Sequence, residues 1–345
     1  MLKVGVVGTG GIFKFAHLPG WLACNDEVEI VGFCDAFRPS AEAIAKDFAG
    51  VKVYDDYRDL IADPSIDIVG IGTPNVFHSE IAIASLRNGK HVFCEKPDAV
   101  SPLEAQRMAD AARESGKLLM TTRNNRFSEE AKFLKRVSGQ GQLGELYMGR
   151  CGWIRRRGIP GAGGWFTTKA LSGGGPLIDL GVHMIDLAMW LAGNPRPVTV
   201  SGSTYRKFVD RSNSDGKMNK GTFDVEDLAA GFIRFDNGAS LQIEFSWASN
   251  IEEEKKFLEW RGTEGGFSLV NDKLKLFTEN GGVLIDQQPI FPEAAIPQHT
   301  ANIRHFVACI LGREQPIITP DQGVDMIKIL SAIYESAERG REIRL

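Results

Sequence analysis

Short apolar segments alternate with helical patterns through the first 120 residues of this chain. The apolar segments lie at 3–8, 28–34, 66–72, 91–94 and 118–121, and the helical patterns lie at 11–24, 39–49, 76–88 and 102–115. Apolar strands separated by helices are typical of βαβ units, which build a parallel sheet covered by helices. The alternation therefore predicts an α/β fold that begins with a doubly wound parallel sheet.

A strict alternation of apolar and polar residues appears later in the chain. It covers ASLQIEFSW at 239–247, and the Asn237-Gly238 pair before it is a strong signal for a hairpin with the preceding apolar run. Further strand-like segments lie at 255–261, 266–270, 273–277 and 283–286. The pattern predicts an α+β domain whose antiparallel sheet has one packed face and one face that is wet or paired with another subunit.

The length of 345 residues supports two domains, because single cores rarely grow beyond about 250–300 residues. The change of pattern places the boundary near 122–128, and we predict domains at 1–124 and 125–345. An amphipathic helix closed by a glycine is predicted at 321–339.

The composition argues against several classes of partner. A net charge of −4 and a pI of about 5.9 provide no basic surface for nucleic acid or an anionic membrane. No run of ~20 apolar residues could span a bilayer, and the chain begins on a strand pattern rather than a secretory leader. Five scattered cysteines without a CxxC pair indicate reduced thiols, so we predict a cytoplasmic protein.

The first predicted strand ends in a glycine-rich turn, VGVVGTGGIF. Gly8 and Gly10 lie where glycine allows close backbone approach and where helix N–H groups face a pyrophosphate. Phe13 replaces the third glycine of the G-x-G-x-x-G pattern, a position that serves helix packing rather than phosphate binding. Asp35 ends the second strand and can accept both ribose hydroxyls of NAD, whereas Arg38 could meet the 2′-phosphate of NADP. We expect NAD, with NADP less favoured.

Two later strands end in segments that suit the same edge of the sheet, TPN at 73–75 and EKP at 95–97. Ligands of an open parallel sheet bind outside the carboxyl ends of the strands, so both segments are predicted to lie at the cofactor site. The proline after Lys96 disfavours a helical conformation at the lysine, which leaves its ammonium group free to project.

The segment GGGPLIDLGVHMIDLAMWLAG at 173–193 is apolar on nearly every side, yet Asp179, His183 and Asp186 fall on one helical stripe. Asp179 can hold one imidazole nitrogen of His183, four residues on, while the ring accepts a proton near neutral pH. A buried polar network without catalysis is the alternative. Zinc is not expected, because no third ligand accompanies the pair. We expect Asp186 to be structural and the glycines to bring the backbone close to a substrate.

GTPNVFHSEIAIASLRNGKHVFCEKP, together with the segment at 173–193, resembles the Gfo/Idh/MocA family of sugar and polyol oxidoreductases over essentially the whole chain. The resemblance implies a Rossmann domain followed by a domain with a large, open, mainly antiparallel sheet that joins subunits into a homodimer or homotetramer. It implies that Lys96, Asp179 and His183 are catalytic and that the Lys96-Pro97 bond is cis. The helix at 321–339 is expected to pack back on the first domain.

These motifs define the expected site residues. The cofactor residues are expected to be Gly8, Gly10, Gly11, Ile12, Phe13, Asp35, Arg38, Thr73, Pro74, Asn75, His78, Glu95 and Lys96. The arginines and tryptophan of WIRRRGIPGAGGWF (153–166) suit a hydroxyl-rich or anionic substrate, with a charged strand end as the alternative. The substrate residues are expected to be Lys96, Arg126, Arg155, Arg157, Trp165, Asp179 and His183, without a metal. Asn125-Arg126 replaces the paired arginines of inositol dehydrogenases, which disfavours inositol.

The predicted function is an NAD(P)-dependent dehydrogenase that acts on a secondary hydroxyl of a sugar, a sugar derivative or a cyclitol. His183 would accept the hydroxyl proton, and Lys96 would polarise the oxygen. An NAD-dependent glycosidase, which oxidises its substrate transiently without net NADH, is one alternative. A non-catalytic regulator that senses NAD or a sugar is another, and the presence of Lys96 with Asp179 and His183 argues against it.

Overall fold

The computed structural model describes residues 1–209 and 221–345, and the chain divides into two compact units. The first unit comprises Met1–Phe127 and Ala295–Val324, and the second comprises Ser128–Ala294 and Asp325–Leu345. The division after Phe127 falls in the predicted boundary region. Residues 295–324, which the sequence analysis placed in the second domain, group with the first unit.

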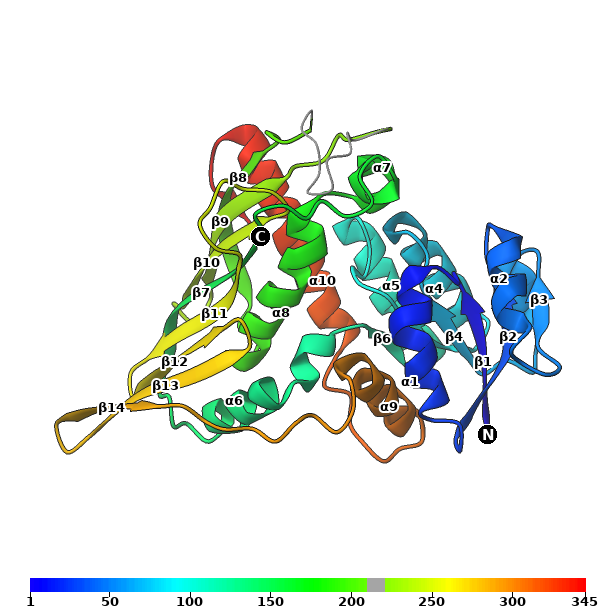
Figure 1. Cartoon of the computed structure of the whole chain (residues 1–345), viewed down its shortest axis with the longest axis horizontal. Helices are drawn as coiled ribbons and strands as arrows, with labels where there is room; N and C mark the ends of the chain where they lie inside the picture. The colour runs from blue at the N-terminus through cyan, green and yellow to red at the C-terminus, as the bar shows by residue number, and fades with distance from the viewer. Residues whose placement is uncertain (210–220) are drawn as a thin grey trace. The chain divides into compact units, whose positions relative to one another are not determined.

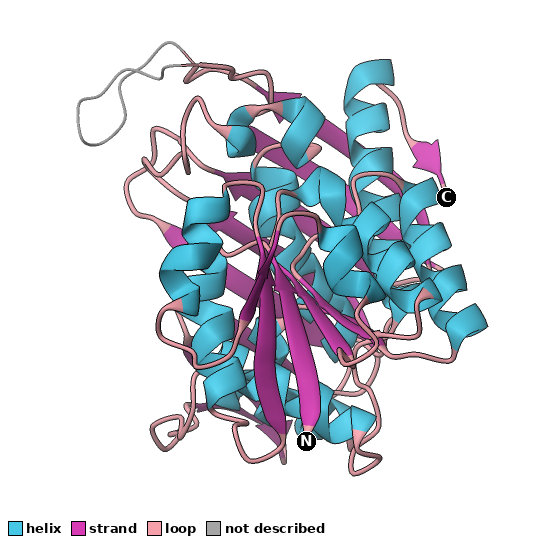
Figure 2. Cartoon of the chain, turned by 90° about the vertical axis from the view of Figure 1, so that its right-hand side faces the viewer, coloured by secondary structure: helices cyan, strands magenta, loops and turns pink. Residues whose placement is uncertain are grey.

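A six-stranded parallel sheet forms the centre of the first unit, in the order β3-β2-β1-β4-β5-β6. Its strands fan out in Figure 2, with helices on both flanks. The strands are β1 (Leu2–Val7), β2 (Val28–Cys34), β3 (Lys52–Tyr54), β4 (Ile68–Ile71), β5 (His91–Cys94) and β6 (Leu119–Thr121). The strand order reverses between β1 and β4, which is the point where such sheets bind ligands.

The helices of the first unit follow the predicted pattern, with additional helices at 57–62 and 298–310. They are a π-helical turn (Phe13–His17), α1 (Leu18–Leu22), α2 (Arg38–Ala45), α3 (Tyr57–Ala62), α4 (His78–Arg87), α5 (Pro102–Ser115) and α9 (Gln298–Ile310). Short 3-10 turns occupy Asn75–Phe77 and Asn124–Phe127. β3 and α3 were not predicted from the sequence, because these short, partly exposed elements carry little apolar periodicity.

Buried aromatic side chains hold the helices of the first unit to its sheet. Trp21 of α1 packs edge-on against Phe93 of β5 and Phe306 of α9. Phe93 and Phe306 are also in contact with each other, at 5.4 Å between ring centroids. This shared core explains why α9 belongs to the first unit although it lies far along the sequence.

A nine-stranded, mainly antiparallel sheet forms the second unit, in the order β14-β13-β12-β11-β7-β10-β9-β8-β15. The strands are β7 (Leu146–Ile154), β8 (Pro197–Tyr205), β9 (Leu228–Phe235), β10 (Ser240–Ser246), β11 (Lys255–Gly262), β12 (Gly265–Val270), β13 (Lys273–Asn280), β14 (Val283–Gln287) and β15 (Ile343–Arg344). β10 and β7 are parallel. Gly238 has φ +87° and turns β9 into β10, which confirms the predicted hairpin.

Helices cover one face of this sheet. They are α6 (Glu129–Gly139), a π-helical turn (Leu177–Gly181) that continues into α8 (Val182–Leu191), and the later part of α10 (Pro320–Arg339). The unit also contains the short helix α7 (Lys169–Ser172). A further 3-10 turn occupies Trp165–Thr167. α8 lies against β7 and β11, with α6 beside it (Figure 1). Trp260 of β11 anchors the helix by donating its indole N–H to the Ala188 carbonyl at 3.2 Å.

The two sheets confirm the predicted fold class, a doubly wound parallel sheet followed by a large, mainly antiparallel one. None of the helices in the described part of the chain is long and apolar enough to cross a membrane.

Candidate active site

The glycine-rich turn after β1 forms a surface that suits a pyrophosphate. Gly8 has φ +92°, and a Cβ on it would lie 2.6 Å from the Gly72 carbonyl carbon, so only glycine fits between the ends of β1 and β4. A Cβ on Gly10 or Gly11 would meet no atom within 4 Å. The backbone of these two residues therefore faces open space at the start of a helix, where N–H groups bind phosphate.

Phe13 occupies the position of the missing third glycine. Its side chain is fully buried and packs edge-on against Phe33 of β2, at 5.8 Å between centroids. The helix adopts a wider π-helical turn from Phe13 to His17, directly after the half-buried Ile12. Phe13 thus contributes to packing, and its buried side chain is not available to a cofactor.

Asp35 lies at the carboxyl end of β2, where its carboxylate is held by local donors. Oδ2 accepts the Thr9 backbone N–H at 2.7 Å and the Thr9 hydroxyl at 2.9 Å, and Oδ1 accepts the Phe37 N–H at 2.8 Å. A carboxylate has about four acceptor positions, so this one retains capacity for a ribose hydroxyl. The half-buried side chain is therefore pre-oriented for the role predicted for it.

Arg38 forms ion pairs with Glu42 and Asp55, the former at 2.7 Å. Both carboxylates neutralise the guanidinium. This arrangement favours NAD over NADP, because a 2′-phosphate would have to compete with two existing acidic partners.

The segment after β4 presents one orphaned polar atom. The Thr73 hydroxyl oxygen is buried and has no hydrogen-bond partner among the described residues, which fits a polar group of a bound cofactor beside it. Pro74 is half-buried next to it, whereas Asn75 is 7% exposed.

His78 is fully buried, unlike a cofactor contact. One ring nitrogen faces the Pro97 carbonyl at 2.8 Å and the other faces the Thr73 carbonyl at 2.9 Å. Burial lowers the pKa of His78, and the two carbonyl contacts act against that shift. The side chain ties the end of β4 to the Lys96-Pro97 turn, so we interpret His78 as supporting the site rather than touching the cofactor.

Lys96 is partly exposed between the buried residues Glu95 and Pro97. Its peptide bond to Pro97 is cis, as predicted. Glu95 is 5% exposed; its Oε1 lies 2.7 Å from the His17 Nε2 atom, and its Oε2 accepts the Lys96 backbone N–H at 3.0 Å. Glu95 therefore positions the lysine from within the protein, and neither Glu95 nor His17 presents an exposed surface to a ligand.

Arg126 is 1% exposed. Its guanidinium donates to the Ile317 carbonyl at 2.5 Å and to the Gln322 side-chain oxygen at 3.0 Å, both within the first unit. These contacts are those of a structural arginine, in contrast to the substrate contact expected from its position in the sequence.

The helix that carries the polar stripe lies in the second unit and exposes only two of its side chains in part. From Leu177 to Leu191 every residue is buried except Asp179 and His183, which are partly exposed. Asp186 is 4% exposed, in line with the structural role expected of it. Asp179 lies within the π-helical turn, a feature that often marks functional sites in helices.

Two tryptophans that no sequence motif indicates as site residues contact this pair. Trp247, fully buried after β10, donates its indole N–H to the Asp179 Oδ2 atom at 3.0 Å. Trp153 of β7 lies beside His183, with 6.5 Å between ring centroids. The alternation in 239–247 identified Trp247 only as an apolar residue of the packed face, because indole donors carry no separate sequence signal.

Two of the three glycines before the helix pack closely against protein, in contrast to the expectation that the glycines bring the backbone close to a substrate. A Cβ on Gly174 would lie 2.0 Å from the Tyr334 hydroxyl, and one on Gly175 would lie 2.0 Å from the Glu226 carbonyl oxygen. Neither glycine leaves room for a ligand on that side. They allow the start of the helix to approach Glu226 and Tyr334.

The predicted substrate loop contains partly exposed cations that have protein partners. Arg155 stacks its guanidinium 4.9 Å from the Trp153 ring centre and donates to the Gly158 carbonyl at 3.2 Å. Arg157 donates to the Ser249 carbonyl at 3.0 Å. Trp165 stacks on Phe166 at 3.9 Å. Of these three residues, Arg155 is the one linked through Trp153 to His183.

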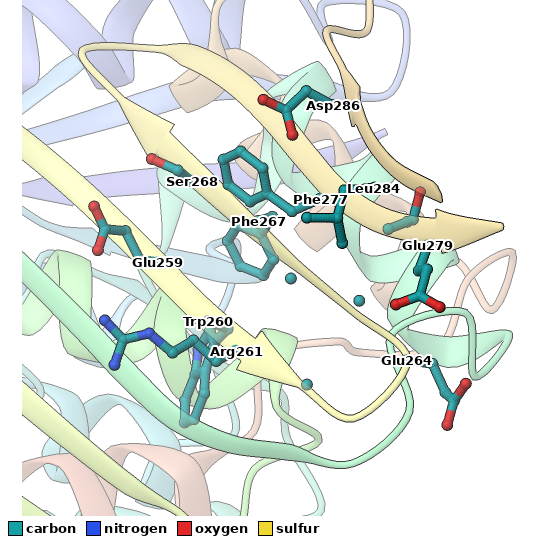
Figure 3. A pocket seen from close by; sticks show the side chains of 14 residues that line it. Glu259, Trp260, Arg261, Glu264, Phe267, Ser268, Phe277, Glu279, Leu284 and Asp286 are labelled. Carbon is teal, nitrogen blue, oxygen red and sulfur yellow. The ribbon is translucent and has the colours of Figure 1, made fainter. Parts of the chain in front are cut away.

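A separate hollow of about 620 Å³ lies on strands β11 to β14 of the second unit (Figure 3). It contains none of the predicted site residues. Aromatic and charged side chains line it, among them Phe267, Phe277, Glu259, Arg261, Glu264, Glu279 and Asp286.

Comparison with known proteins places these features in a family. Residues 2–123 match the family model of an oxidoreductase family with an NAD-binding Rossmann fold, GFO/IDH/MocA, and residues 132–268 match the C-terminal domain of the same family. D-glucoside 3-dehydrogenase of Escherichia coli (strain K12) is 33% identical over 349 residues, covering 100% of this chain and 97% of that protein.

Two further comparisons agree. Levoglucosan dehydrogenase of Pseudarthrobacter phenanthrenivorans is 31% identical over 284 residues, covering 76% of this chain and 72% of that protein. A solved structure of a levoglucosan dehydrogenase in complex with NADH and L-sorbose has a TM-score of 0.88 at 25% identity and covers 100% of this chain and 98% of that chain. The fold and its matches define an NAD-dependent oxidoreductase. The chain belongs to the GFO/IDH/MocA family, which confirms the resemblance noted in its sequence.

Proposed function

We propose that this protein oxidises a secondary hydroxyl group of a sugar, a glycoside or a cyclitol, with NAD as the hydride acceptor. The observation that carries the proposal is the exposure of Asp179 and His183 on an otherwise buried helix. An acid and an imidazole that a helix exposes together are suited to move a proton. The names of the relatives, a glucoside dehydrogenase and a levoglucosan dehydrogenase, support a carbohydrate as the substrate.

Each proposed catalytic residue has a distinct role. His183 accepts the hydroxyl proton as the carbon–hydrogen bond breaks, and Asp179 orients the imidazole while Trp247 holds the Asp179 carboxylate. Lys96 donates a hydrogen bond to the substrate oxygen and stabilises its developing negative charge. Bound NAD supplies the hydride acceptor. Gly10, Gly11, Asp35 and Thr73 are the residues that we propose hold it.

Substrate contacts beyond this set come from the second unit. We propose Trp153 and Arg155 as substrate neighbours, because Trp153 contacts His183 and Arg155 stacks on Trp153. Arg157 and Trp165 remain candidates at the same loop. Arg126 is left out of the proposed set, since its guanidinium binds the first unit's own backbone.

The function is tested by following NADH formation with NAD or NADP and a panel of glucosides, anhydrosugars, free sugars, sugar acids and cyclitols. We expect NADH formation with at least one carbohydrate. A 4-nitrophenyl glucoside in the panel separates oxidation from glycoside cleavage. Nitrophenol release without net NADH would favour the glycosidase, whereas NAD binding without turnover of any substrate would favour the regulator.

Substitution of Asp35 by serine is expected to move the cofactor preference toward NADP. The variant loses the acceptor for the ribose hydroxyls and the negative charge that repels a 2′-phosphate. The measurement is the ratio of kcat/KM with NAD to that with NADP, which we expect to fall by at least ~10-fold. Asp47→Ser serves as a matched control, because Asp47 is an exposed carboxylate of the same unit. An unchanged ratio in Asp35→Ser would exclude the ribose role.

We also propose that the protein assembles into a homodimer or homotetramer through the nine-stranded sheet. The edge hairpin β13–β14 and the loop after it expose large apolar side chains, including Leu284 at 82% and Ile290 at 95%. Exposed apolar groups of this size beside a hollow are typical of protein interfaces. Sedimentation velocity is expected to show a dimer or tetramer, and a monomer at all concentrations would contradict the proposal.

A further inference from the structure

A buried carboxylate lies at the start of the helix that carries Asp179 and His183. Glu226 precedes β9 and is 7% exposed. Its Oε2 accepts the Gly175 N–H at 2.9 Å, and its Oε1 accepts the Leu177 N–H at 3.1 Å and the Tyr334 hydroxyl at 2.8 Å. All four residues belong to the second unit.

These contacts provide hydrogen-bond acceptors for backbone N–H groups at the start of the helix. The first N–H groups of a helix have no partner within it, and a carboxylate there is also favoured by the helix dipole. Pro176 has no N–H, so Gly175 and Leu177 on either side of it are the available donors. Asp179 follows two residues after Leu177, within the π-helical turn that this cap begins.

The residue after Glu226 is also connected to Asp179, through hydrogen bonds of Trp247. The carbonyl of Asp227, the residue after Glu226, accepts the Trp247 backbone N–H at 3.0 Å. The indole of Trp247 in turn donates to the Asp179 carboxylate at 3.0 Å. Residues 226 and 227 therefore hold Asp179 both through the helix start and through its indole partner.

We propose that Glu226 is a positioning residue for the Asp179–His183 pair, and that catalysis depends on its carboxylate and not only on the stability it contributes. The proposal rests on the proposed function and extends it to a side chain that touches no substrate. Gly174 and Gly175 allow this capping arrangement, because any Cβ there would collide with Tyr334 or Glu226. Three hydrogen-bond donors converge on the two oxygens of Glu226. A glutamine would replace one of these acceptor oxygens by an NH2 group, which is itself a donor, so the site requires a carboxylate.

The test compares Glu226→Gln with Tyr334→Phe, which removes one donor and keeps the cap, and with Glu335→Gln as a control. Glu335 lies on α10 beside Tyr334 and pairs with Arg339 on the surface. For Glu226→Gln we expect kcat to fall ~10-fold or more, with a smaller change in KM, an unchanged NAD affinity and a shifted pH profile of kcat. Tyr334→Phe is expected to show a smaller effect in the same direction, and Glu335→Gln none.

A second readout does not depend on turnover. The chain has six histidines, and the ring-proton signal of His183 can be assigned by its loss in His183→Asn. In Glu226→Gln we expect the titration midpoint of His183 to move to lower pH, since the imidazolium loses part of the stabilisation by Asp179. The other five histidines are expected to titrate as in the wild type.

The outcomes separate the two proposals. If the wild type oxidises no carbohydrate of the panel, the proposed function fails, and the His183 titration still decides the positioning role. A folded Glu226→Gln protein with a wild-type His183 titration, kcat and pH profile would overturn the positioning role, even if its melting temperature is lower.

Discussion

Alanine at Lys96 or at His183 is expected to lower kcat at least ~100-fold while the affinity for NAD stays nearly unchanged. Lys96→Ala removes the hydrogen-bond donor proposed for the substrate oxygen, and His183→Ala removes the proton acceptor. Neither substitution alters the glycine turn, Asp35 or Thr73. Turnover is measured with the best carbohydrate of the panel, and cofactor affinity by the fluorescence of bound NADH.

The double variant sharpens this prediction. If Lys96 and His183 act on the same hydroxyl, removing one deprives the other of most of its effect, so the losses in the double variant are strongly non-additive. Losses that multiply would mean that the two residues act on separate steps. Near-native rates in both single variants would contradict the assignment of the site. Lys52→Ala is the control for loss of a lysine in the first unit, because Lys52 is exposed and pairs with Asp63 at the surface.

Alanine at His17 is expected to destabilise the first unit by about 3–5 kcal/mol, because it leaves the Glu95 carboxylate buried without its partner. The two side chains are 1% and 5% exposed, so water cannot replace the lost contact. Chemical denaturation followed by tryptophan fluorescence gives the free energy of unfolding. His17→Gln retains a side-chain N–H and is expected to recover part of the loss.

The pH dependence of that loss has a definite sign. Burial by itself raises the pKa of Glu95, but the hydrogen bond from His17 and the charges of His17, Lys96 and His299 outweigh it and lower the pKa below the ordinary value of 4.5. A carboxyl group whose pKa is lowered by folding stabilises the protein above that ordinary value and loses this contribution as the pH falls. The cost of His17→Ala is therefore expected to be larger at about pH 6 than at about pH 3.5. An equal cost at both pH values would show that the pair contributes by packing alone.

His17 also illustrates what the sequence alone leaves open. In the sequence it lies 78 residues from Glu95, and no motif connects them. The EKP segment predicted Lys96 as a site residue, and it predicted that Glu95 lies beside the cofactor. In the folded chain the π-helical turn brings His17 beneath the end of β5, and Glu95 turns inward to it. A buried pair of this kind depends on the approach of two elements, which local sequence does not encode.

Much of the fold could be predicted because it follows from local patterns. Apolar strands between helices specify a parallel sheet, and Asn237-Gly238 followed by alternating residues specifies the β9–β10 hairpin. The glycine turn and Asp35 indicate a dinucleotide for the same reason: phosphate and ribose recognition needs these residue types at the ends of consecutive strands. β3 was not predicted, because its three residues are at most partly buried and lack the buried apolar run of the equally short β6.

At the polar stripe in 173–193, the tertiary structure determined which residues are exposed and which partners they have. The sequence alone determined that Asp179 and His183 lie on one helix whose other residues are mostly apolar and buried. Only the packing showed that these two are the exposed residues, that Trp247 holds Asp179, and that the glycines before them face Glu226 and Tyr334. The physical reason is that helical periodicity orders residues along one element, whereas exposure, capping and hydrogen-bond partners depend on the surfaces that distant segments bring against it.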